Sequence, residues 1–134
     1  MIEYVTSLEG VEAEDLDGFF VGWPTRPSTR SHLELLRGSE RVVLARDGES
    51  GQVVGFVNAV GDGVLSAFVP LLEVLPEHQG RGIGTELVRR MLALLDDRYM
   101  VDVCCDDDFV PFYERFDMVR VNGMVRRTPS SIPR

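Results

Sequence analysis

The clearest pattern of apolar and polar positions begins at Ile83. Apolar side chains recur there at the three- and four-residue spacing of a helix with one buried face, at Leu87, Val88, Met91, Leu92, Leu94 and Leu95. Glu86 stands four residues before Arg90, a spacing at which a carboxylate and a guanidinium pair on a helix surface. The pattern therefore predicts an amphipathic helix that packs against the rest of the protein.

Stretches rich in β-branched and other apolar residues predict strands at Ile2 to Thr6, Arg41 to Arg46, Gln52 to Val60, Val64 to Leu75 and Tyr99 to Cys105. Asp47-Gly48 and Gly61-Asp62-Gly63 are turn sequences, so the second, third and fourth strands are expected to form hairpins. Pro70 interrupts the fourth stretch. Because proline cannot donate to a strand ladder, it predicts a bulge or bend.

The remaining patterns predict short helices at Glu12 to Leu16, Ser28 to Arg37 and Val110 to Phe116. Met118 to Val121 and Met124 to Arg126 predict a closing hairpin around Asn122-Gly123. This order of elements indicates one α/β (α+β) domain over residues 1–127, with a mixed, mostly antiparallel sheet flanked by helices. Residues 128–134, with two prolines and two serines, are expected to form a flexible tail.

A glycine-rich loop separates the fourth strand from the long helix. Glycines at 80, 82 and 84 allow tight bends that point successive N–H groups into one concavity. The helix that starts there adds unpaired amides and about half a positive charge, which favours a phosphate group. A dinucleotide fingerprint needs glycine where Thr85 stands, and a mononucleotide P-loop needs a lysine that the loop lacks. The alternative is a glycine turn without a ligand.

Composition narrows the class of protein. A chain of 134 residues with 44% apolar and 27% charged residues is typical of one globular domain. A formal charge of −8 and a pI near 4.7 argue against a nucleic-acid partner and favour cations, amines among them. No apolar run is long enough for a membrane span, and the N-terminus has no export signal. Adjacent Cys104 and Cys105 can hardly bridge each other, so we expect a cytoplasmic, reducing compartment.

The segment Gln79 to Gly84 resembles the Gln/Arg-x-x-Gly-x-Gly/Ala loop of the GNAT superfamily of N-acetyltransferases. As in that family, it follows a strand ending in Val-x-Pro, here Val74-Leu75-Pro76. About thirty residues later, Val110 to Met118 is similar to the second signature of the family, a short helix carrying Phe-Tyr. The resemblance implies a GNAT fold, acetyl-CoA as the acetyl-donor cosubstrate, and a small-molecule or peptide amine as acceptor. Dimers are common in the family, so a homodimer is a further expectation.

The resemblance also implies which residues contact acetyl-CoA. The loop would hold the pyrophosphate with Gln79, Gly80, Arg81, Gly82, Ile83, Gly84 and Thr85. The pantetheine arm would receive main-chain contacts from Leu72, Glu73 and Val74. We expect no metal.

Acyl transfer to an amine needs an acid and a base. In many GNAT enzymes the tyrosine of the short helix points at the CoA sulfur, so Tyr113 is the candidate general acid; a phenol of pKa near 10 stays protonated at neutral pH. Glu73 and Asp102 each stand inside an apolar strand, and buried carboxylates tend to have raised pKa values suited to a base. Either is a candidate base, and either is alternatively structural.

The acceptor pocket is expected in the first forty residues, where Phe19, Phe20 and Trp23 either wall it or cap the core. Asp106 stands where family members often carry asparagine, and Asp117 where a Gly-Phe turn often needs positive φ. Two alternatives stay open. One is an acetyl-cysteine route through Cys104 or Cys105, although cysteine at a buried strand end is usually core. The other is a non-catalytic acyl-CoA-binding sensor or interaction module.

Overall fold

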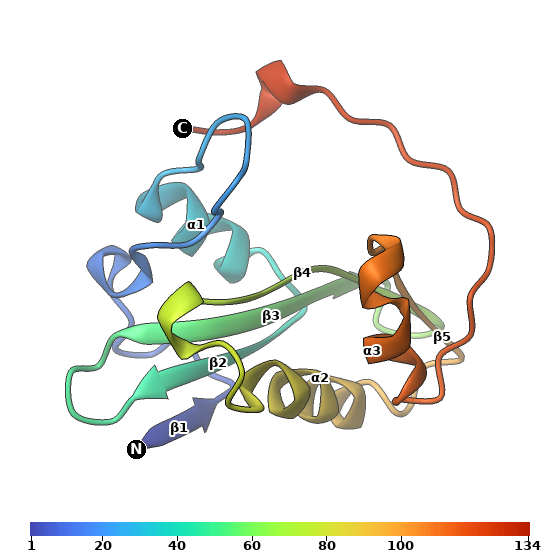
Figure 1. Ribbon diagram of the computed structural model, residues 1–134, viewed down its shortest axis with the longest axis horizontal. Coiled ribbons are helices and arrows are strands. Elements are labelled where there is room, and N and C mark those ends of the chain that lie inside the picture. Colours follow the sequence, from blue (N-terminus) through green and yellow to red (C-terminus); the bar gives the residue numbers. More distant parts are fainter.

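A computed structural model describes residues 1–134 and contains one five-stranded sheet in the order β1-β2-β3-β4-β5 (Figure 1). The strands are β1 (Ile2–Val5), β2 (Arg41–Asp47), β3 (Val53–Gly61), β4 (Ser66–Val74) and β5 (Met100–Val103). Neighbouring strands are antiparallel from β1 to β4, whereas β5 runs parallel to β4. The predicted mixed, mostly antiparallel sheet is therefore confirmed.

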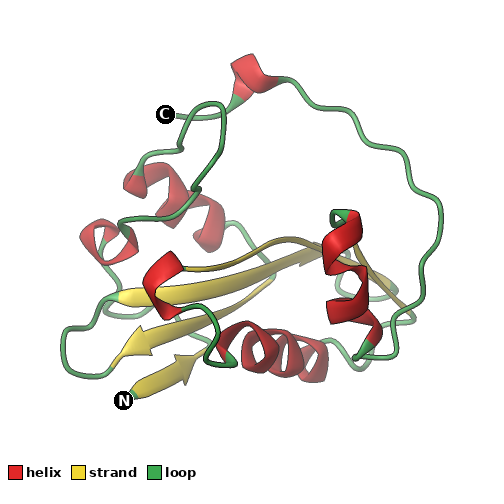
Figure 2. Ribbon diagram, viewed as in Figure 1, coloured by secondary structure: helices red, strands yellow, loops and turns green.

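Helices cover both faces of this sheet (Figure 2). They are α1 (Thr29–Arg37), α2 (Ile83–Leu94) and the short α3 (Val110–Glu114). The His32 ring of α1 lies 4.4 Å from the ring of Phe56 in β3. A Cβ on the adjacent Gly55 would meet Leu87 and Ile83 of α2 at 3.1 and 3.2 Å. Because successive residues of a strand face opposite sides, α1 and α2 lie on opposite faces.

The predicted amphipathic helix is α2. Its buried residues are Ile83, Leu87, Val88 and Met91, and all of these except Val88 belong to the core cluster that includes residues of the sheet. The expected surface pair is present, with Arg90 Nε 2.6 Å from Glu86 Oε2. Ser28 caps α1 by accepting a hydrogen bond from the Ser31 N–H at 3.1 Å. The short helix expected near residue 12 is a 3-10 helix over Ala13–Leu16.

The bend predicted at Pro70 is a bulge. Asn58 pairs with Leu71 and Val60 with Phe68, so the register between β3 and β4 shifts by one residue beside Pro70. On its other side β4 pairs with β5 only up to Val69 and Val103. From Pro70 onward β4 has no neighbour on that side, and a gap opens between the two parallel strands.

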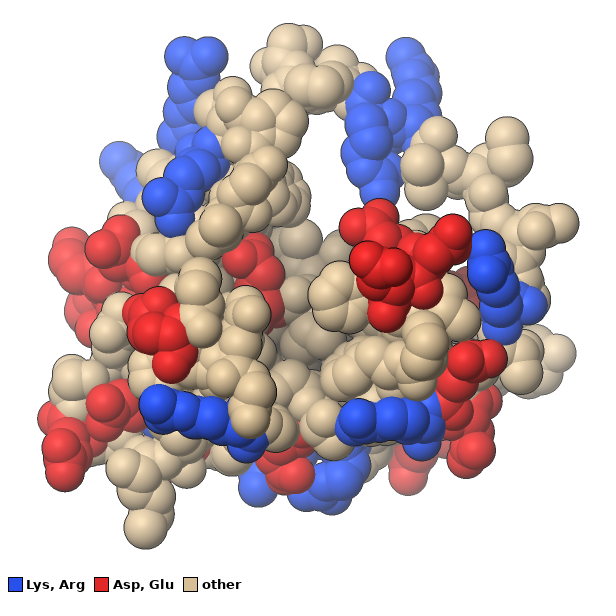
Figure 3. Space-filling view, in the orientation of Figure 1, with Lys and Arg blue, Asp and Glu red and all other residues tan.

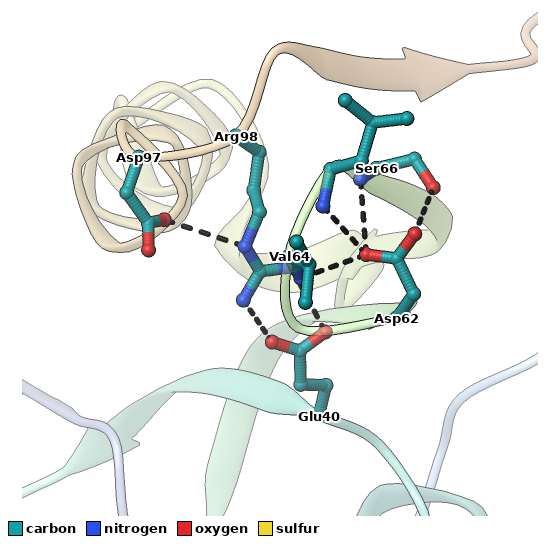
Figure 4. Close-up of polar contacts among 7 residues, drawn as sticks. Glu40, Asp62, Val64, Ser66, Asp97 and Arg98 are labelled. Carbon is teal, nitrogen blue, oxygen red and sulfur yellow. Dashed lines mark hydrogen bonds and ion pairs between the residues drawn. The ribbon is translucent and has the colours of Figure 1, made fainter.

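A polar cluster fixes the start of β5 (Figure 4). The Arg98 side chain is 3% exposed, and its guanidinium donates to both carboxylate oxygens of Glu40, one of them at 3.0 Å. The carboxylate of Asp62 accepts from the N–H groups of Val64, Leu65 and Ser66 at 2.8, 2.7 and 3.2 Å. Met100 N then donates to Leu65 O at 3.1 Å. These contacts hold the turn between β3 and β4, the start of β2 and the start of β5 together.

The predicted closing hairpin is wrong. Residues 118–128 form no strand, and the chain leaves the body of the protein in a wide arc after α3 (Figure 1). The alternating pattern there pairs with no strand of the chain, and alternation alone does not make a strand. Pro129–Ser131 form a 3-10 turn, and Ser31 Oγ donates to Arg134 O at 3.2 Å. No helix is both long and apolar enough to cross a bilayer.

Candidate active site

The glycine loop forms a cradle of main-chain N–H groups at the start of α2. Gly80 and Gly82 both have φ +80°, a conformation that favours glycine. None of the N–H groups of residues 80–85 donates to an acceptor in the chain. These groups, together with the positive end of the helix dipole, make a site for an anion. The structure thus brings together the predicted loop residues from Gly80 to Thr85.

Arg115 adds a cation to this cradle. Its Nη2 donates to Thr85 Oγ1 at 2.7 Å, and its guanidinium carbon lies 5.3 Å from the Phe112 ring centre and 5.7 Å from that of Phe116. No carboxylate neutralises it within ion-pair distance. Arg81, the cation expected from the sequence, is exposed on the loop. The sequence reasoning missed Arg115 because its role depends on the packing of α3 against α2.

The cradle continues into the open edge of β4. Leu75 N donates to Val54 O at 2.8 Å, and main-chain groups alternate sides along an antiparallel strand. The main-chain groups of Glu73 therefore point toward β3, whereas those of Leu72 and Val74 point into the gap. Gln79 Nε2 donates to Val74 O at 3.0 Å and thereby ties the loop to this edge. Of the three residues predicted for pantetheine, Leu72 and Val74 present main-chain groups on the open side.

Tyr113 lies at the inner end of the gap. Its side chain borders an apolar pocket lined by Val57, Val69, Val88, Met91, Leu92, Val103 and Met118, and Val69 and Val103 are the last paired residues of β4 and β5. Burial raises the pKa of Tyr113 to about 12, with a smaller contribution from the charge of Cys105. The phenol is therefore a neutral hydrogen-bond donor at physiological pH.

The two candidate bases lie in different environments. Glu73 is half-buried; its Oε1 accepts from Phe20 N at 2.9 Å, and its Oε2 is buried without a partner. Desolvation raises the pKa of Glu73, while hydrogen bonds from the main chain of Phe20 and Val21 and the charge of Arg26 oppose the rise. Asp102 is exposed, so the burial inferred for it from its apolar neighbours is wrong. It pairs with Phe68, which places it roughly 16 Å along β4 from Glu73.

The predicted acceptor-side aromatics divide between core and surface. Phe19 and Phe20 are 3% and 2% exposed and pack around His32, whereas Trp23 is 39% exposed and lies 5.0 Å from the Phe20 ring. Phe20 has φ +63°, an uncommon conformation for a bulky residue. Two contacts hold it there: the Glu73 carboxylate accepts from its N–H, and Arg26 donates to Phe19 O at 2.7 and 3.1 Å.

A cavity of about 210 Å³ opens beside this aromatic loop. It is lined by Leu16, Asp17, Gly18, Phe19, Phe20, Arg26, Pro27, Ser28, Thr29 and His32. Both ring nitrogens of His32 are buried without a hydrogen-bond partner, and burial lowers its pKa to about 4. The imidazole is therefore neutral at physiological pH. The cavity adjoins Glu73 through the Phe20 main chain.

Asp117 and the two cysteines lie on either side of α3. Asp117 has φ +60°, so aspartate adopts the turn conformation that the sequence comparison anticipated for glycine. Cys104 and Cys105 are both exposed and follow the end of β5, so the expectation that they are core residues is wrong. Partial desolvation and then the charge of Asp106 raise the pKa of the Cys105 thiol, which disfavours the thiolate that an acetyl-cysteine route requires.

Comparison with known proteins agrees with this geometry. Residues 8–118 match the Acetyltransferase (GNAT) family. The match covers strands β2 to β5, the glycine loop and α3, and it ends where the chain leaves the body of the protein. The chain therefore belongs to the GNAT acetyltransferase family, and it is a transferase by family.

Solved structures share the fold over nearly the whole chain. A candidate acetyltransferase from Deinococcus radiodurans R1 is 49% identical with a TM-score of 0.93, covering 96% of this chain and 90% of that one. A GNAT family acetyltransferase from Streptococcus pneumoniae TIGR4 is 31% identical with a TM-score of 0.76, covering 96% and 98%. An uncharacterized N-acetyltransferase ycf52-like protein of Prochlorococcus marinus is 31% identical over 113 residues, 82% of this chain and 62% of that protein.

Proposed function

We propose that this protein transfers the acetyl group of acetyl-CoA to an amine acceptor by direct transfer in a ternary complex. The observation that carries the proposal is the continuity of three features: the N–H cradle of residues 80–85, the open edge of β4, and Tyr113 at its inner end. Their order suits a long ligand with an anionic group at one end and its reacting atom at the other. The residues present thus fit acetyl-CoA.

The two ends of the ligand have distinct partners in this proposal. The cradle and Arg115 hold the pyrophosphate through main-chain N–H groups and one guanidinium. Leu72 and Val74 align the pantetheine arm as if it were a neighbouring strand. When bound, acetyl-CoA supplies an acetyl group activated as a thioester.

Tyr113 and Glu73 handle the protons. The Tyr113 phenol, kept neutral by burial, donates its proton to the sulfur as the carbon–sulfur bond breaks. A lysine-like ammonium of pKa near 10.4 costs up to roughly 4.6 kcal/mol to deprotonate at pH 7. Glu73 has a raised pKa and one buried oxygen without a partner, so it is our candidate to take that proton, directly or through water. The amine nitrogen then forms the bond to the acetyl carbon.

The acceptor in this proposal is a small-molecule or peptide amine. The cavity beside Phe19 and Phe20 lies on the Glu73 side of β4, and the exposed indole of Trp23 stands on the same loop. A compact amine of a few carbon atoms suits a space of about 210 Å³. The net charge of −8 favours a cationic acceptor.

Thermal shift with acetyl-CoA, NAD and ATP tests the cofactor assignment. Acetyl-CoA at about 100 times its Kd should add about 2.7 kcal/mol of stability. Gly82→Asp places a carboxylate in the cradle and should remove the shift. The matched control is Gly63→Asp, because Gly63 has φ +79°, has nothing within 4 Å of an added Cβ, and lies at the opposite end of β4. An equal shift with ATP, or an equal loss in both variants, would contradict the assignment.

Release of free thiol across a panel of amines tests the transfer itself. Transfer predicts thiol release that depends on both acetyl-CoA and an amine. If acetyl-CoA binds at the cradle and no amine in a broad panel releases thiol, the protein is a non-catalytic acyl-CoA-binding module. That outcome would leave the cofactor assignment intact and overturn the enzymatic part.

A further inference from the structure

The cavity beside the aromatic loop lies where α1 begins. Arg26, Ser28, Thr29 and His32 are among the residues that line it. Residues 24–33 contain two arginines and no acidic residue, so this stretch carries +2 in a chain of −8. Figure 3 shows basic side chains along the upper rim, above α1, and acidic ones across the body below. The surroundings of the cavity are therefore positive although the protein as a whole is acidic.

The guanidinium of Arg26 has no anionic partner in the chain. Its Nε and Nη2 donate to Phe19 O at 3.1 and 2.7 Å, which orients the group without neutralising it. No carboxylate lies within ion-pair distance of it. Asp17, the one acidic residue that lines the cavity, is exposed and is also outside that distance. Nη1 of Arg26 is therefore free to donate to an anionic group.

The first turn of α1 adds main-chain donors. Ser28 Oγ accepts from Ser31 N at 3.1 Å, whereas the N–H groups of Thr29 and Arg30 have no acceptor in the chain. This turn contains no acidic residue that would offset the positive end of the helix dipole. Unpaired N–H groups and the dipole together favour an anion at this position.

His32 is a buried polar group without a partner in the same cavity. It is 1% exposed, and neither Nδ1 nor Nε2 has a hydrogen-bond partner. A neutral imidazole carries one N–H donor, and buried polar groups in proteins are nearly always paired. A carboxylate bound in the cavity would supply the missing acceptor. The unpaired imidazole is thus an observation, independent of the helix, that points to a ligand.

The cavity lies on the same face of the sheet as the Glu73 side chain. Glu73 pairs with Phe56 across β3 and β4, and directly paired residues of antiparallel strands place their side chains on one face. The ring centre of Phe56 lies 4.4 Å from that of His32 and 5.1 Å from that of Phe19, and both of these residues line the cavity. A ligand held in the cavity can therefore direct its amine along this face toward the proposed base.

We propose that the cavity binds a carboxylate group of the acceptor, so that the amine that is acetylated belongs to a small amino acid. The Arg26 guanidinium, the N–H groups at the start of α1 and the His32 imidazole hold the carboxylate, and the amine extends toward Glu73. A space of about 210 Å³ accommodates a carboxylate and a short carbon chain. The inference rests on the proposed function and narrows its acceptor to amines that also carry a carboxylate. The ammonium group of such an acceptor is still attracted to the acidic body.

Paired acceptors test the carboxylate. Each α- or ω-amino acid of a panel is compared with its primary amide, which keeps the amine and the carbon chain but removes the negative charge. The comparison is made at equal concentrations of the uncharged amine. For at least one pair, kcat/KM for thiol release should be at least about tenfold higher with the acid, because a hydrogen bond to a charged group is stronger than one to a neutral group.

Arg26→Gln should lower this acid-to-amide ratio about tenfold, because it removes the cation and keeps a polar side chain. The ratio is insensitive to a general loss of activity, which affects both acceptors alike. The matched control is Arg30→Gln. It removes the same charge from a side chain that lies 3.8 Å from the Glu34 carboxylate and does not line the cavity, so the ratio should stay within about twofold.

The outcomes separate this inference from the proposed function. Equal thiol release from acid and amide in every pair would overturn the inference and leave acetyl transfer intact. An equal loss of the ratio in Arg26→Gln and Arg30→Gln would also overturn it, because the preference would then come from general charge. Thiol release from no amine at all would overturn the transfer itself, and the inference with it.

Nuclear magnetic resonance of labelled histidine gives a readout without turnover. His32 and His78 are the only histidines of the chain, and His78 does not line the cavity. In the protein with CoA bound, the acid of a pair should shift the ring signals of His32, whereas its amide should not, and the signals of His78 should stay in place. If no acid shifts the His32 signals, or if the amides shift them equally, the carboxylate does not bind in this cavity.

Discussion

Burial acts on Tyr113, Glu73 and His32 in the same sense, because it disfavours the charged form of each. It raises the pKa of the tyrosine and the glutamate and lowers that of the histidine. The consequences differ with position. Tyr113 lies at the gap between the parallel strands, where a neutral donor is useful to a departing thiolate. His32 is enclosed by the rings of Phe19, Phe20 and Phe56. There the second N–H of a protonated imidazole would have no hydrogen-bond acceptor.

Tyr113→Phe should lower kcat about 100-fold while the Kd for acetyl-CoA stays within about twofold. The substitution removes one oxygen and keeps the ring that contacts the apolar pocket, so it removes the proton donor alone. Steady-state thiol release measures kcat, and calorimetry measures the Kd for acetyl-CoA. The matched control is Tyr99→Phe, which removes the same hydroxyl from a side chain that is 86% exposed just before β5. An unaltered kcat in Tyr113→Phe would refute the role of the phenol.

His32 should make stability fall as pH drops from about 6.5 to about 4. The folded-state pKa is about 4 and the ordinary value is 6.5, so over this window the unfolded chain binds a proton that the folded protein does not. The loss is up to about 3 kcal/mol, is absent above pH 6.5, and levels off below pH 4. Urea unfolding at several pH values measures it.

Carboxylates titrate in the same pH window. The test therefore compares the pH dependence of the unfolding free energy between variants. His32→Leu should flatten the pH dependence of the unfolding free energy relative to the native chain, whatever its absolute stability. Leu87→Ala, in α2 on the other face of the sheet, leaves His32 in place and should keep the native slope. Equal slopes in the native chain and His32→Leu would show that the imidazole is not held neutral.

At the scale of elements, the sequence predicted β4, the glycine loop and α2 because the signals for them are local. These signals are the helical spacing of apolar residues, the bend at Pro70 and the glycines that adopt positive φ. What the sequence did not predict depends on contacts between distant segments. The exposure of Asp102 depends on which face of β5 is covered. The closing hairpin failed because alternation predicts a strand without naming its neighbour. Arg115 went unnoticed because Thr85, its partner, is 30 residues away.

Arg115→Met should weaken acetyl-CoA binding about tenfold. Methionine keeps an apolar stem beside Phe112 and Phe116 but removes the guanidinium, and a charge-assisted hydrogen bond is worth about 1.5–3 kcal/mol before screening at the surface. Isothermal titration measures the Kd. Arg37→Met, at the exposed end of α1, removes the same charge far from the cradle and should leave the Kd unchanged. Equal Kd values in both variants would remove Arg115 from the site.

On the scale of the whole molecule, charge and apolar surface are unevenly distributed. One face of the sheet is covered by α1 and the aromatic loop, the other by α2, and the proposed reaction site lies where β4 and β5 separate between them. Residues 1–117 carry −12, whereas residues 118–134 carry +4 and expose Val119, Val121, Met124 and Val125. An acidic body attracts cations, which supports the proposal of a cationic amine as acceptor.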